Sequence, residues 1–296
     1  MPSKQSPSGM SIWWMAARPK TLFAGLCPVI MGTMIAFKDQ HFHLLSALGA
    51  LLGALLIQIG TNFANDYFDF KKGADTPNRL GPTRVTSAGF ITPATMLKAT
   101  IITFMLAAAV GSYLILRGGW PIVWIGIASL LSGILYTGGP FPLGYLGLGD
   151  LFVLIFFGPI AVAGTYYVQA LSWSLPSILL GFSPGLFSVA ILTANNLRDV
   201  REDSQSHKKT LVVRFGKTFG KSQYLISVML ACFLPAILYG KDNFLTYLCV
   251  FTIMAAQTTF KRIWNQEGQI LNQALADTGK LLLLFTFLFC VAWRLK

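Results

Sequence analysis

Nine long stretches with almost no charged residues run through this chain of 296 residues. An α-helix rises 1.5 Å per residue, so about 20 apolar residues cross the hydrocarbon core of a bilayer. Charged residues make up only 11% of the chain, against about 25% in soluble domains, so we expect lipid to be its solvent. The sequence therefore predicts an all-α, polytopic membrane bundle of nine transmembrane helices, over residues 21–37, 44–65, 99–116, 120–137, 151–170, 177–196, 222–240, 243–260 and 278–293.

The basic residues indicate how these helices are oriented. A net charge of +12 would suggest nucleic-acid binding in a soluble protein. With nine spans and a cytoplasmic N-terminus, 18 of the 23 Lys and Arg residues fall on the cytoplasmic side and five on the other. This asymmetry agrees with the positive-inside rule. We therefore expect a multi-pass protein of the cell inner membrane, in contact with membrane lipid, with its polar site facing the cytoplasm and no nucleic-acid partner.

Nothing in the sequence divides the chain into domains. The polar opening of residues 1–10 is expected to be disordered, and no linker or low-complexity tract follows it, so residues 1–296 are predicted to form a single domain. The cysteines stand singly in apolar stretches without a CxxC pair, which favours packing over a disulfide or a zinc site. They are Cys27, Cys232, Cys249 and Cys290.

Six of the eleven carboxylates gather in two clusters, directly after the second and the sixth predicted helices. Ionisable residues are costly in a membrane and usually mark function, so their placement is informative. In the first cluster, Asn62, Asp66 and Asp69 are spaced i, i+4 and i+7, which puts them on one face of a helix. Gly73 is expected to end that helix and to place Asp75 in the loop.

The second cluster repeats this plan. Asn195, Asp199 and Asp203 share a helix face at i, i+4 and i+8, and a Lys pair follows at 208–209 as it does at 71–72. The negative charges would repel one another unless a cation lies between them. Carboxylate and amide oxygens suit hard divalent cations, and Mg²⁺ usually completes its shell with water and substrate phosphates. The sequence therefore predicts Mg²⁺ as cofactor and a diphosphate as substrate, with a solvated charged rim as the alternative.

The patterns Asn62…Asp66-x-x-Asp69…Asp75 and Asn195…Asp199-x-x-x-Asp203 resemble the two aspartate-rich motifs of the UbiA superfamily of intramembrane prenyltransferases. Residues 17–22, 65–84, 145–158 and 196–211 resemble the branch of that superfamily that acts on 1,4-dihydroxy-2-naphthoate. The resemblance implies a helical bundle whose pocket opens partly to lipid beneath a cap of two polar loops. The chain departs from the pattern at two places: no basic residue follows Tyr136-Thr137, and His207 stands where relatives have Gly.

The resemblance also implies an activity. It is the Mg²⁺-dependent transfer of a polyprenyl group from polyprenyl diphosphate to an aromatic acid acceptor, 1,4-dihydroxy-2-naphthoate, with loss of CO₂, as in menaquinone or phylloquinone-type biosynthesis. Another aromatic acceptor, such as 4-hydroxybenzoate or homogentisate, is an alternative. A cation-coupled secondary transporter is an alternative of a different class, although its acids usually lie near the bilayer midplane rather than at helix ends.

The candidate site residues fall into three groups by chemistry. The metal is expected to be held by the carboxylates of Asp66, Asp69, Asp75, Asp199 and Asp203, of which Asp75 has the alternative role of ordering its loop. Neutral oxygen donors for metal or substrate are expected from Asn62, Asn65, Asn195 and Asn196. The cations expected to neutralise the departing diphosphate are Lys72, Arg84, Arg198 and Lys208.

Three further residues each have two interpretations. Asp150 either positions or deprotonates the acceptor, or simply favours a helix N-terminus. Tyr136 either stabilises the allylic cation or orients the acceptor, with a structural role as the alternative. Arg18 either meets the acceptor carboxylate or the diphosphate, or anchors the first span at the membrane interface.

Overall fold

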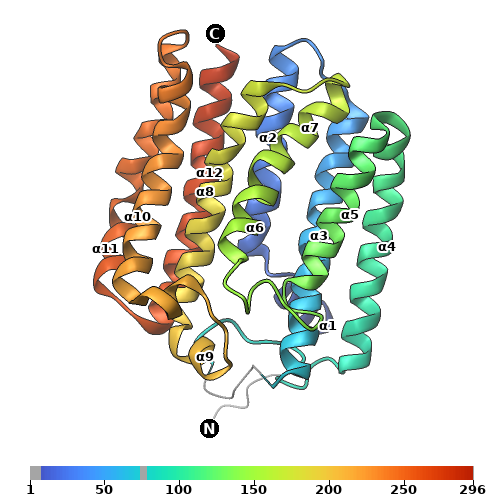
Figure 1. Cartoon of the computed structure of the whole chain (residues 1–296), viewed down its shortest axis with the longest axis vertical. Helices are drawn as coiled ribbons and strands as arrows, with labels where there is room; N and C mark the ends of the chain where they lie inside the picture. Colours follow the sequence, from blue (N-terminus) through green and yellow to red (C-terminus); the bar gives the residue numbers. More distant parts are fainter. Residues whose placement is uncertain (1–7, 74–78, 296) are drawn as a thin grey trace.

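The protein is described from a computed structural model, in which residues 8–73 and 79–295 are placed. These residues form helices and no strands, and the long helices run side by side along the long axis of the molecule (Figure 1). Each of the nine predicted windows contains a helix. The α-helices are α1 (Gly9–Ala17), α2 (Leu22–Lys38), α3 (Leu44–Lys71), α4 (Pro93–Gly118), α5 (Trp120–Leu135), α6 (Gly149–Ile155), α7 (Ala161–Ala170), α8 (Leu175–Arg198), α9 (Val200–Gln205), α10 (Leu211–Tyr239), α11 (Thr252–Asn265) and α12 (Leu271–Arg294). Short helical turns are η1 (Pro19–Thr21), η2 (Phe156–Ile160), η3 (Phe244–Phe251) and η4 (Gly268–Ile270).

Seven helices within the described ranges are long and apolar enough to cross a membrane, two fewer than the nine predicted spans. Helix α5 has 16 residues, and its length of about 24 Å is less than the ~30 Å of the hydrocarbon core. The window 243–260 begins as the 3₁₀ turn η3 and continues as the 14 residues of α11. The chain is an all-helical integral membrane protein, and the nine-span topology stays a prediction.

The N-terminal helix α1 begins earlier than the sequence suggested. The hydroxyl of Ser8 accepts a hydrogen bond from the Ser11 amide and caps the helix, so residues 9 and 10 are helical where disorder was expected. Residues 1–7 lie outside the described part of the chain. Helix α1 packs on α3 through Trp13 and Phe63, whose ring centroids are 5.6 Å apart. It ends at Arg18, which has a left-handed backbone conformation (φ 52°) and turns the chain into α2.

Helices α6 and α7 are two halves of one apolar segment, joined by the π-helical turn η2. Gly158 leaves helical geometry there (φ −113°, ψ −114°), and Pro159 has no N–H to continue the hydrogen-bond ladder. Helix α8 approaches this kink closely, because a Cβ added to Gly185 would lie 2.4 Å from the carbonyl oxygen of Leu154. The kink is therefore fixed by packing against a glycine face of α8.

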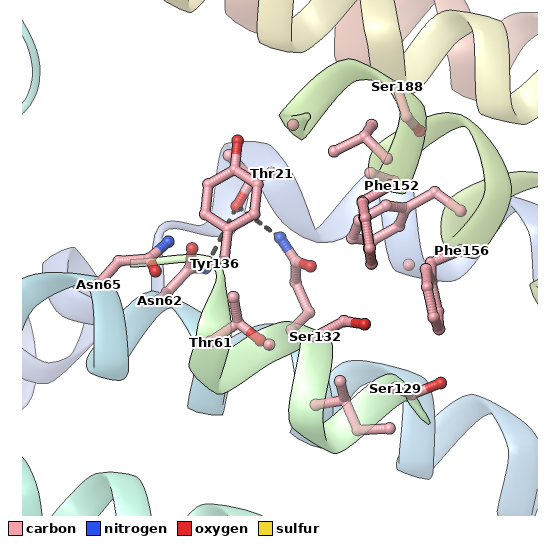
Figure 2. Close-up of a pocket in the computed structure, with 18 of the residues that line it drawn as sticks. Thr21, Thr61, Asn62, Asn65, Ser129, Ser132, Tyr136, Phe152, Phe156 and Ser188 are labelled. Atoms are coloured by element: carbon pink, nitrogen blue, oxygen red, sulfur yellow. Dashed lines mark hydrogen bonds between the residues drawn. The ribbon is translucent and has the colours of Figure 1, made fainter. Parts of the chain in front are cut away.

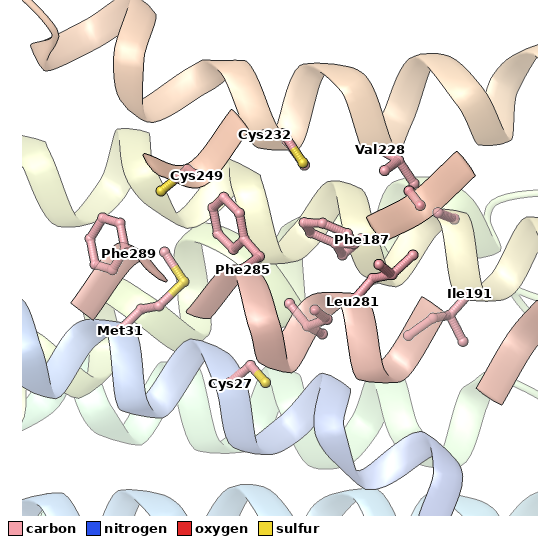
Figure 3. Close-up of a cluster of buried hydrophobic side chains, with 14 of the residues drawn as sticks. Cys27, Met31, Phe187, Ile191, Val228, Cys232, Cys249, Leu281, Phe285 and Phe289 are labelled. Carbon is pink, nitrogen blue, oxygen red and sulfur yellow. The ribbon is translucent and has the colours of Figure 1, made fainter. Parts of the chain in front are cut away.

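The main apolar core lies among α2, α8, α10 and α12. Phe187 of α8 and Phe285 of α12 pack with ring centroids 5.2 Å apart (Figure 3). Cys27, Cys232 and Cys249 are fully buried in this cluster, which confirms their predicted role in packing. This dense half of the bundle leaves α3, α4, α5 and the kinked α6–α7 segment to enclose a cavity with one face of α8.

Candidate active site

A cavity of about 580 Å³ runs along the inside of the bundle. Charged and amide side chains from the ends of α3 and α8 and from α9 line one end, which is the lower end in Figure 1. Apolar side chains line the opposite end, where Leu114, Ile122 and Val168 lie. The cavity therefore matches a ligand with a charged head and an apolar body.

The two acidic clusters meet at the charged end of this cavity, as the sequence predicted. Asp69 at the end of α3 and Asp203 in α9 both line it, and both are buried. The ammonium nitrogen of Lys208 lies 3.6 Å from Asp69 Oδ1 and 3.9 Å from Asp203 Oδ1. One cation thus bridges carboxylates that are 134 residues apart in the chain.

Asp69 is the carboxylate with the most contacts in the first cluster. Arg84 Nη2 donates a 2.6 Å hydrogen bond to its Oδ2, and the Tyr145 hydroxyl donates a 3.1 Å hydrogen bond to its Oδ1. Arg84 is itself only 7% exposed, so this pair is shielded from bulk solvent. Asp69 and Arg84 therefore lie in the cavity as predicted, each already held in place.

Asp66 has a different environment from Asp69. Its Oδ2 accepts a 3.2 Å hydrogen bond from the Val85 amide, and its Oδ1 accepts a 3.0 Å bond from the Thr86 amide. Asp66 thus holds the loop after α3 and does not belong to the cavity lining. The predicted helix end is confirmed, because α3 stops at Lys71 and Gly73 is left-handed (φ 64°). Asp75 lies outside the described residues.

The second cluster does not lie on one continuous helix, so that part of the prediction was wrong. Helix α8 ends at Arg198, Asp199 has a non-helical backbone (φ −96°, ψ 11°), and α9 begins after it. The amide of Asp199 still bonds the carbonyl of Asn195 at 3.0 Å, and the amide of Asp203 bonds the carbonyl of Asp199 at 2.8 Å. Because these bonds keep a helical spacing, all three polar side chains still line the cavity.

Two of the four predicted phosphate-binding cations, Arg198 and Lys72, are not among the residues that line the cavity. Arg198 donates to both oxygens of Asp199 and, at 2.6 Å each, to the side-chain oxygens of Asn195 and Asn272. Lys72 donates a 2.6 Å hydrogen bond to the Thr137 carbonyl. Both side chains tie helix ends together. Lys208 and Arg84 are the predicted cations that line the cavity.

The predicted amide donors line the cavity and also hold the surrounding helices. Asn62 donates to the Ala17 carbonyl at 2.9 Å and to the Thr21 hydroxyl at 3.3 Å, which joins α3 to the α1–α2 connection. Asn65 Oδ1 accepts a 2.8 Å hydrogen bond from the Thr137 hydroxyl. Asn195 and Asn196 line the opposite wall from α8. Along α3 and α8 the amides thus lie next to the carboxylates, on the side towards the middle of the bundle.

The three residues with open roles all reach this cavity. Tyr136, at the end of α5, lies between the Asn62–Asn65 side and the rings of Phe152 and Phe156 (Figure 2). Those two rings stack with centroids 5.9 Å apart. Asp150 at the start of α6 accepts a 2.7 Å hydrogen bond from Gln223. Arg18 lines the cavity from the turn between α1 and α2.

His207, the departure before Lys208, has the left-handed conformation that glycine favours, with φ 58°. The Lys208 amide then bonds the Asp203 carbonyl at 2.8 Å and closes the turn. The chain therefore keeps the turn without the glycine, and Lys208 is delivered to the acidic clusters.

Sequence reasoning did not assign several residues that complete the site. Glu202 accepts a 2.8 Å hydrogen bond from the Leu80 amide, and Asn272 donates a 3.0 Å bond to the Leu80 carbonyl. Together they hold the loop after α3 over the charged end. Tyr145 lies against two ammonium groups, with Lys72 at 4.6 Å and Lys208 at 4.9 Å from its ring centroid. Glu202 was visible as part of an acidic cluster, whereas α12 gave no signal for Asn272.

The donor chemistry of the charged end fits Mg²⁺. The carboxylates of Asp69, Asp199, Glu202 and Asp203 and several amide oxygens, all hard donors, line this end of the cavity. Burial raises the pKa of Asp203 to about 7; Lys208 opposes this rise, and the negative charges of Asp199 and Asp69 add to it. In the described residues no three acidic, His or Cys side chains converge closely enough to form a metal site as they stand. Asp69, Asp199 and Asp203 are the carboxylates that would hold a divalent cation at this end.

Comparisons with known proteins agree with this geometry. Residues 25–289 match the model of the UbiA prenyltransferase family. The chain is 35% identical to a 1,4-dihydroxy-2-naphthoate octaprenyltransferase from Haemophilus influenzae over 95% of this chain and 94% of that one. It is 40% identical to the enzyme of that name from Escherichia coli over 77% and 76% of the two chains. A UbiA homolog from Archaeoglobus fulgidus bound to GPP and Mg²⁺ has the same fold, with a TM-score of 0.67 at 15% identity over 96% and 99% of the chains. The chain belongs to the UbiA prenyltransferase family.

Proposed function

We propose that this protein transfers a polyprenyl group from polyprenyl diphosphate to 1,4-dihydroxy-2-naphthoate, with loss of CO₂, in menaquinone-type biosynthesis. The observation that carries the proposal is the meeting of Asp69, Asp203 and Lys208 at the charged end of a long apolar cavity. Relatives 34–40% identical to this chain are named as octaprenyltransferases for this acceptor, in support of the acceptor assignment. A transporter needs a site accessible from both sides of the membrane, and this cavity ends in buried apolar side chains.

Asp69, Asp199 and Asp203 would hold Mg²⁺, assisted by the amide oxygens of Asn195 and Asn196. Asp66 would support them by holding the loop after α3 through its bonds to the amides of Val85 and Thr86. When bound, Mg²⁺ supplies positive charge to the diphosphate as the allylic C–O bond breaks. Lys208 and Arg84 donate hydrogen bonds to the phosphate oxygens, where negative charge develops in the transition state.

The cavity beyond the amide side chains suits the remaining steps. Phe152 and Phe156 form an aromatic wall that excludes water from the allylic cation, and Tyr136 faces them. Arg18 would receive the acceptor carboxylate, and Asp150 would receive a proton from the acceptor's hydroxyl group; both residues line the cavity. The carbon that bears the acceptor carboxylate bonds to the prenyl C1 as the allylic C–O bond breaks and diphosphate leaves. Loss of CO₂ from that carbon restores the aromatic ring, and Asp150 returns its proton to the ring oxygen.

The test is an assay of the purified full chain with Mg²⁺, a panel of aromatic acids and prenyl diphosphates. We expect product with dihydroxynaphthoate and none when Mg²⁺ is chelated. Conversion of 4-hydroxybenzoate or homogentisate but not dihydroxynaphthoate would contradict the acceptor. Asp199→Ala should lose nearly all turnover while remaining membrane-inserted, and a wild-type rate in that variant would contradict the metal site.

The topology belongs to the same proposal. We propose that residues 1–296 form one domain of nine spans in the cell inner membrane, with the N-terminus and the active site on the cytoplasmic side. The 18-to-5 asymmetry of the basic residues supports this orientation. Single cysteines at Ser204 and at Asp242, on opposite ends of α10, would be labelled by an impermeant thiol reagent from opposite sides of the membrane. Labelling of both from one side would contradict the proposed topology.

A further inference from the structure

We infer that Tyr145 is a positioning residue that keeps the Lys208 ammonium beside the diphosphate once Mg²⁺ occupies the neighbouring carboxylates. The inference rests on the proposed function, because it assigns the charged end of the cavity to a diphosphate and its metal. It gives a role to an uncharged residue of the loop between α5 and α6, residues 136–148.

Lys208 is held at the charged end by carboxylates that a metal would also use. Its ammonium nitrogen lies 3.6 Å from Asp69 Oδ1 and 3.9 Å from Asp203 Oδ1. A divalent cation bound to these carboxylates would offset their negative charge and would itself repel an ammonium at close range. The attraction that places Lys208 is therefore weakest in the state in which the diphosphate needs this cation.

The Tyr145 ring gives the same ammonium a second contact that does not depend on the carboxylates. Lys208 Nζ lies 4.9 Å from the ring centroid. The face of an aromatic ring attracts a cation through its quadrupole, and metal ions bound to the carboxylates do not neutralise it. The Tyr145 hydroxyl donates a 3.1 Å hydrogen bond to Asp69 Oδ1, which fixes the ring at the edge of the metal-binding carboxylates.

Backbone contacts join the loop of Tyr145 to the turn of Lys208. The Lys209 amide donates a 2.9 Å hydrogen bond to the Tyr145 carbonyl. The guanidinium of Arg214 spans both segments, because it donates to the Leu146 carbonyl at 2.7 Å and to the Lys209 carbonyl at 3.0 Å. The ring and the ammonium therefore come from two segments that are held together, so their contact is set before a substrate binds.

The loop between α5 and α6 has no cation of its own to offer a diphosphate, since residues 136–148 include no Lys or Arg. Its Tyr145 ring instead contacts ammonium groups from two other segments. Lys72, at the end of α3, lies 4.6 Å from the ring centroid and donates a 2.6 Å hydrogen bond to the Thr137 carbonyl. The ring thus fixes the loop against α3 while it directs Lys208 to the cavity, which Tyr145 and Lys208 both line.

Positioning Lys208 in advance has a measurable effect on diphosphate binding. A lysine side chain loses rotamer freedom when a ligand orders it. A ring that already restricts this side chain lowers that cost when the diphosphate arrives. Cation–π contacts change a binding constant by about twofold to thirtyfold, with the larger values where the ammonium is desolvated. Lys208 is only 17% exposed, so we expect loss of the ring to weaken diphosphate binding about tenfold.

The experiment measures Mg²⁺-dependent binding of inorganic pyrophosphate to the purified full chain by isothermal titration calorimetry. Pyrophosphate has the charge that the departing group acquires and needs no prenyl tail. Tyr145→Leu, which removes the ring, should weaken binding about tenfold. Tyr145→Phe, which keeps the ring and removes only the hydroxyl bond to Asp69, should stay within about threefold of the wild type. Phe141→Leu is the matched control, because Phe141 is in the same loop, 74% exposed and outside the cavity lining, and this variant should bind as the wild type does.

A double-mutant cycle separates positioning from a structural role of the ring. In Lys208→Met the ring has no Lys208 ammonium to hold, so adding Tyr145→Leu should change pyrophosphate binding by less than about twofold. A tenfold loss that persists in this background would show that the ring acts only through the fold of its loop, and would overturn the inference. Equal losses in Tyr145→Phe and Tyr145→Leu would overturn it too, and so would wild-type binding in Tyr145→Leu.

The same protein tests the proposed function separately. If wild-type protein binds pyrophosphate in Mg²⁺ but yields no product with any aromatic acceptor, the proposed function fails, while the binding cycle still decides the role of Tyr145. If wild-type protein does not bind pyrophosphate in Mg²⁺, the charged end holds no diphosphate and the role of Tyr145 is overturned as well.

Discussion

Replacing Lys208 by methionine separates metal binding from diphosphate departure. The Lys208 ammonium lies 3.6 Å from Asp69 and 3.9 Å from Asp203, two of the carboxylates that we propose hold Mg²⁺. With an effective dielectric constant of about 20, the nearer contact alone has a gross attraction of about 4.6 kcal/mol. In the wild type Mg²⁺ must displace this ammonium, which regains most of that energy from water and phosphate.

We therefore expect Lys208→Met to bind Mg²⁺ more tightly by ~1 kcal/mol, or about fivefold in half-saturating concentration. Turnover should nevertheless fall on the order of a hundredfold, because the transition state loses a cation worth ~3 kcal/mol at the departing diphosphate. The assay is a Mg²⁺ titration of the steady-state rate at saturating substrates. Lys209→Met is the control. Lys209 is the next residue in the chain and its side chain is exposed, so this substitution should leave both the turnover and the half-saturating Mg²⁺ concentration unchanged.

Three results would each refute this reasoning. A wild-type turnover number in Lys208→Met would mean that the ammonium does not act on the diphosphate. If Lys208→Met and Lys209→Met lowered the half-saturating Mg²⁺ concentration equally, only the general charge of the loop would matter. A higher Mg²⁺ requirement confined to Lys208→Met would show that the ammonium organises the metal site instead of competing with it.

Three further predictions concern pH, the turn and helix packing. The pKa of Asp203 is raised to about 7, and Mg²⁺ needs its ionised form. The half-saturating Mg²⁺ concentration should therefore rise about tenfold for each pH unit below 7 and become constant above it. Asp203→Asn should abolish this pH dependence, and a pH dependence that persists in that variant would assign the proton to another group. His207→Val should lower the thermal midpoint by the equivalent of ~1–2 kcal/mol because valine tolerates a φ of 58° poorly, whereas His207→Gly should not, and equal losses in both would deny the left-handed turn. Gly185→Ala should lower stability by about 1–3 kcal/mol, because the added Cβ would lie 2.4 Å from the Leu154 carbonyl oxygen. Gly111→Ala is the control, because a Cβ at that position would have no atom within 4 Å. An unchanged thermal midpoint in Gly185→Ala would contradict the close packing at the kink.

The helices and the meeting of the acidic clusters were predictable from the sequence because both depend on local patterns. A charge-free window of about 20 residues specifies a membrane helix, and the basic residues fix which helix ends share one side. Asp69 and Asp203 were placed at the same end of the bundle on that basis, and the structure brings them to one lysine. Gly73 was also predicted to follow the end of α3, and its positive φ confirms it.

The differences between equivalent residues were not predictable, because contacts distant in sequence decide them. Asp66 and Asp69 have the same helix-face spacing, but Asp66 faces the amides of Val85 and Thr86, while Asp69 faces the cavity. The backbone break at Asp199 likewise interrupts a sequence that reads as continuous helix. Spacing along a helix identifies a polar face, but neighbouring elements determine which of its members reach a ligand.

One face of α3 is enough to orient the substrate. From Asp69 towards the N-terminus of the helix, the residues that line the cavity lie on one helix face and change in order from carboxylate to amide, then to hydroxyl and amide, and then to isoleucine, alanine and glycine. This order is Asp69, Asn65, Asn62, Thr61, Gln58, Ile57, Ala54, Gly53 and Ala50. A prenyl diphosphate in the reverse orientation would place its charged head among alanines and leave the buried carboxylates facing hydrocarbon, and both placements are costly. The same gradient leaves the middle of the cavity, where amides and hydroxyls face the Phe152–Phe156 wall, as the position for a polar aromatic ring between the diphosphate and the tail.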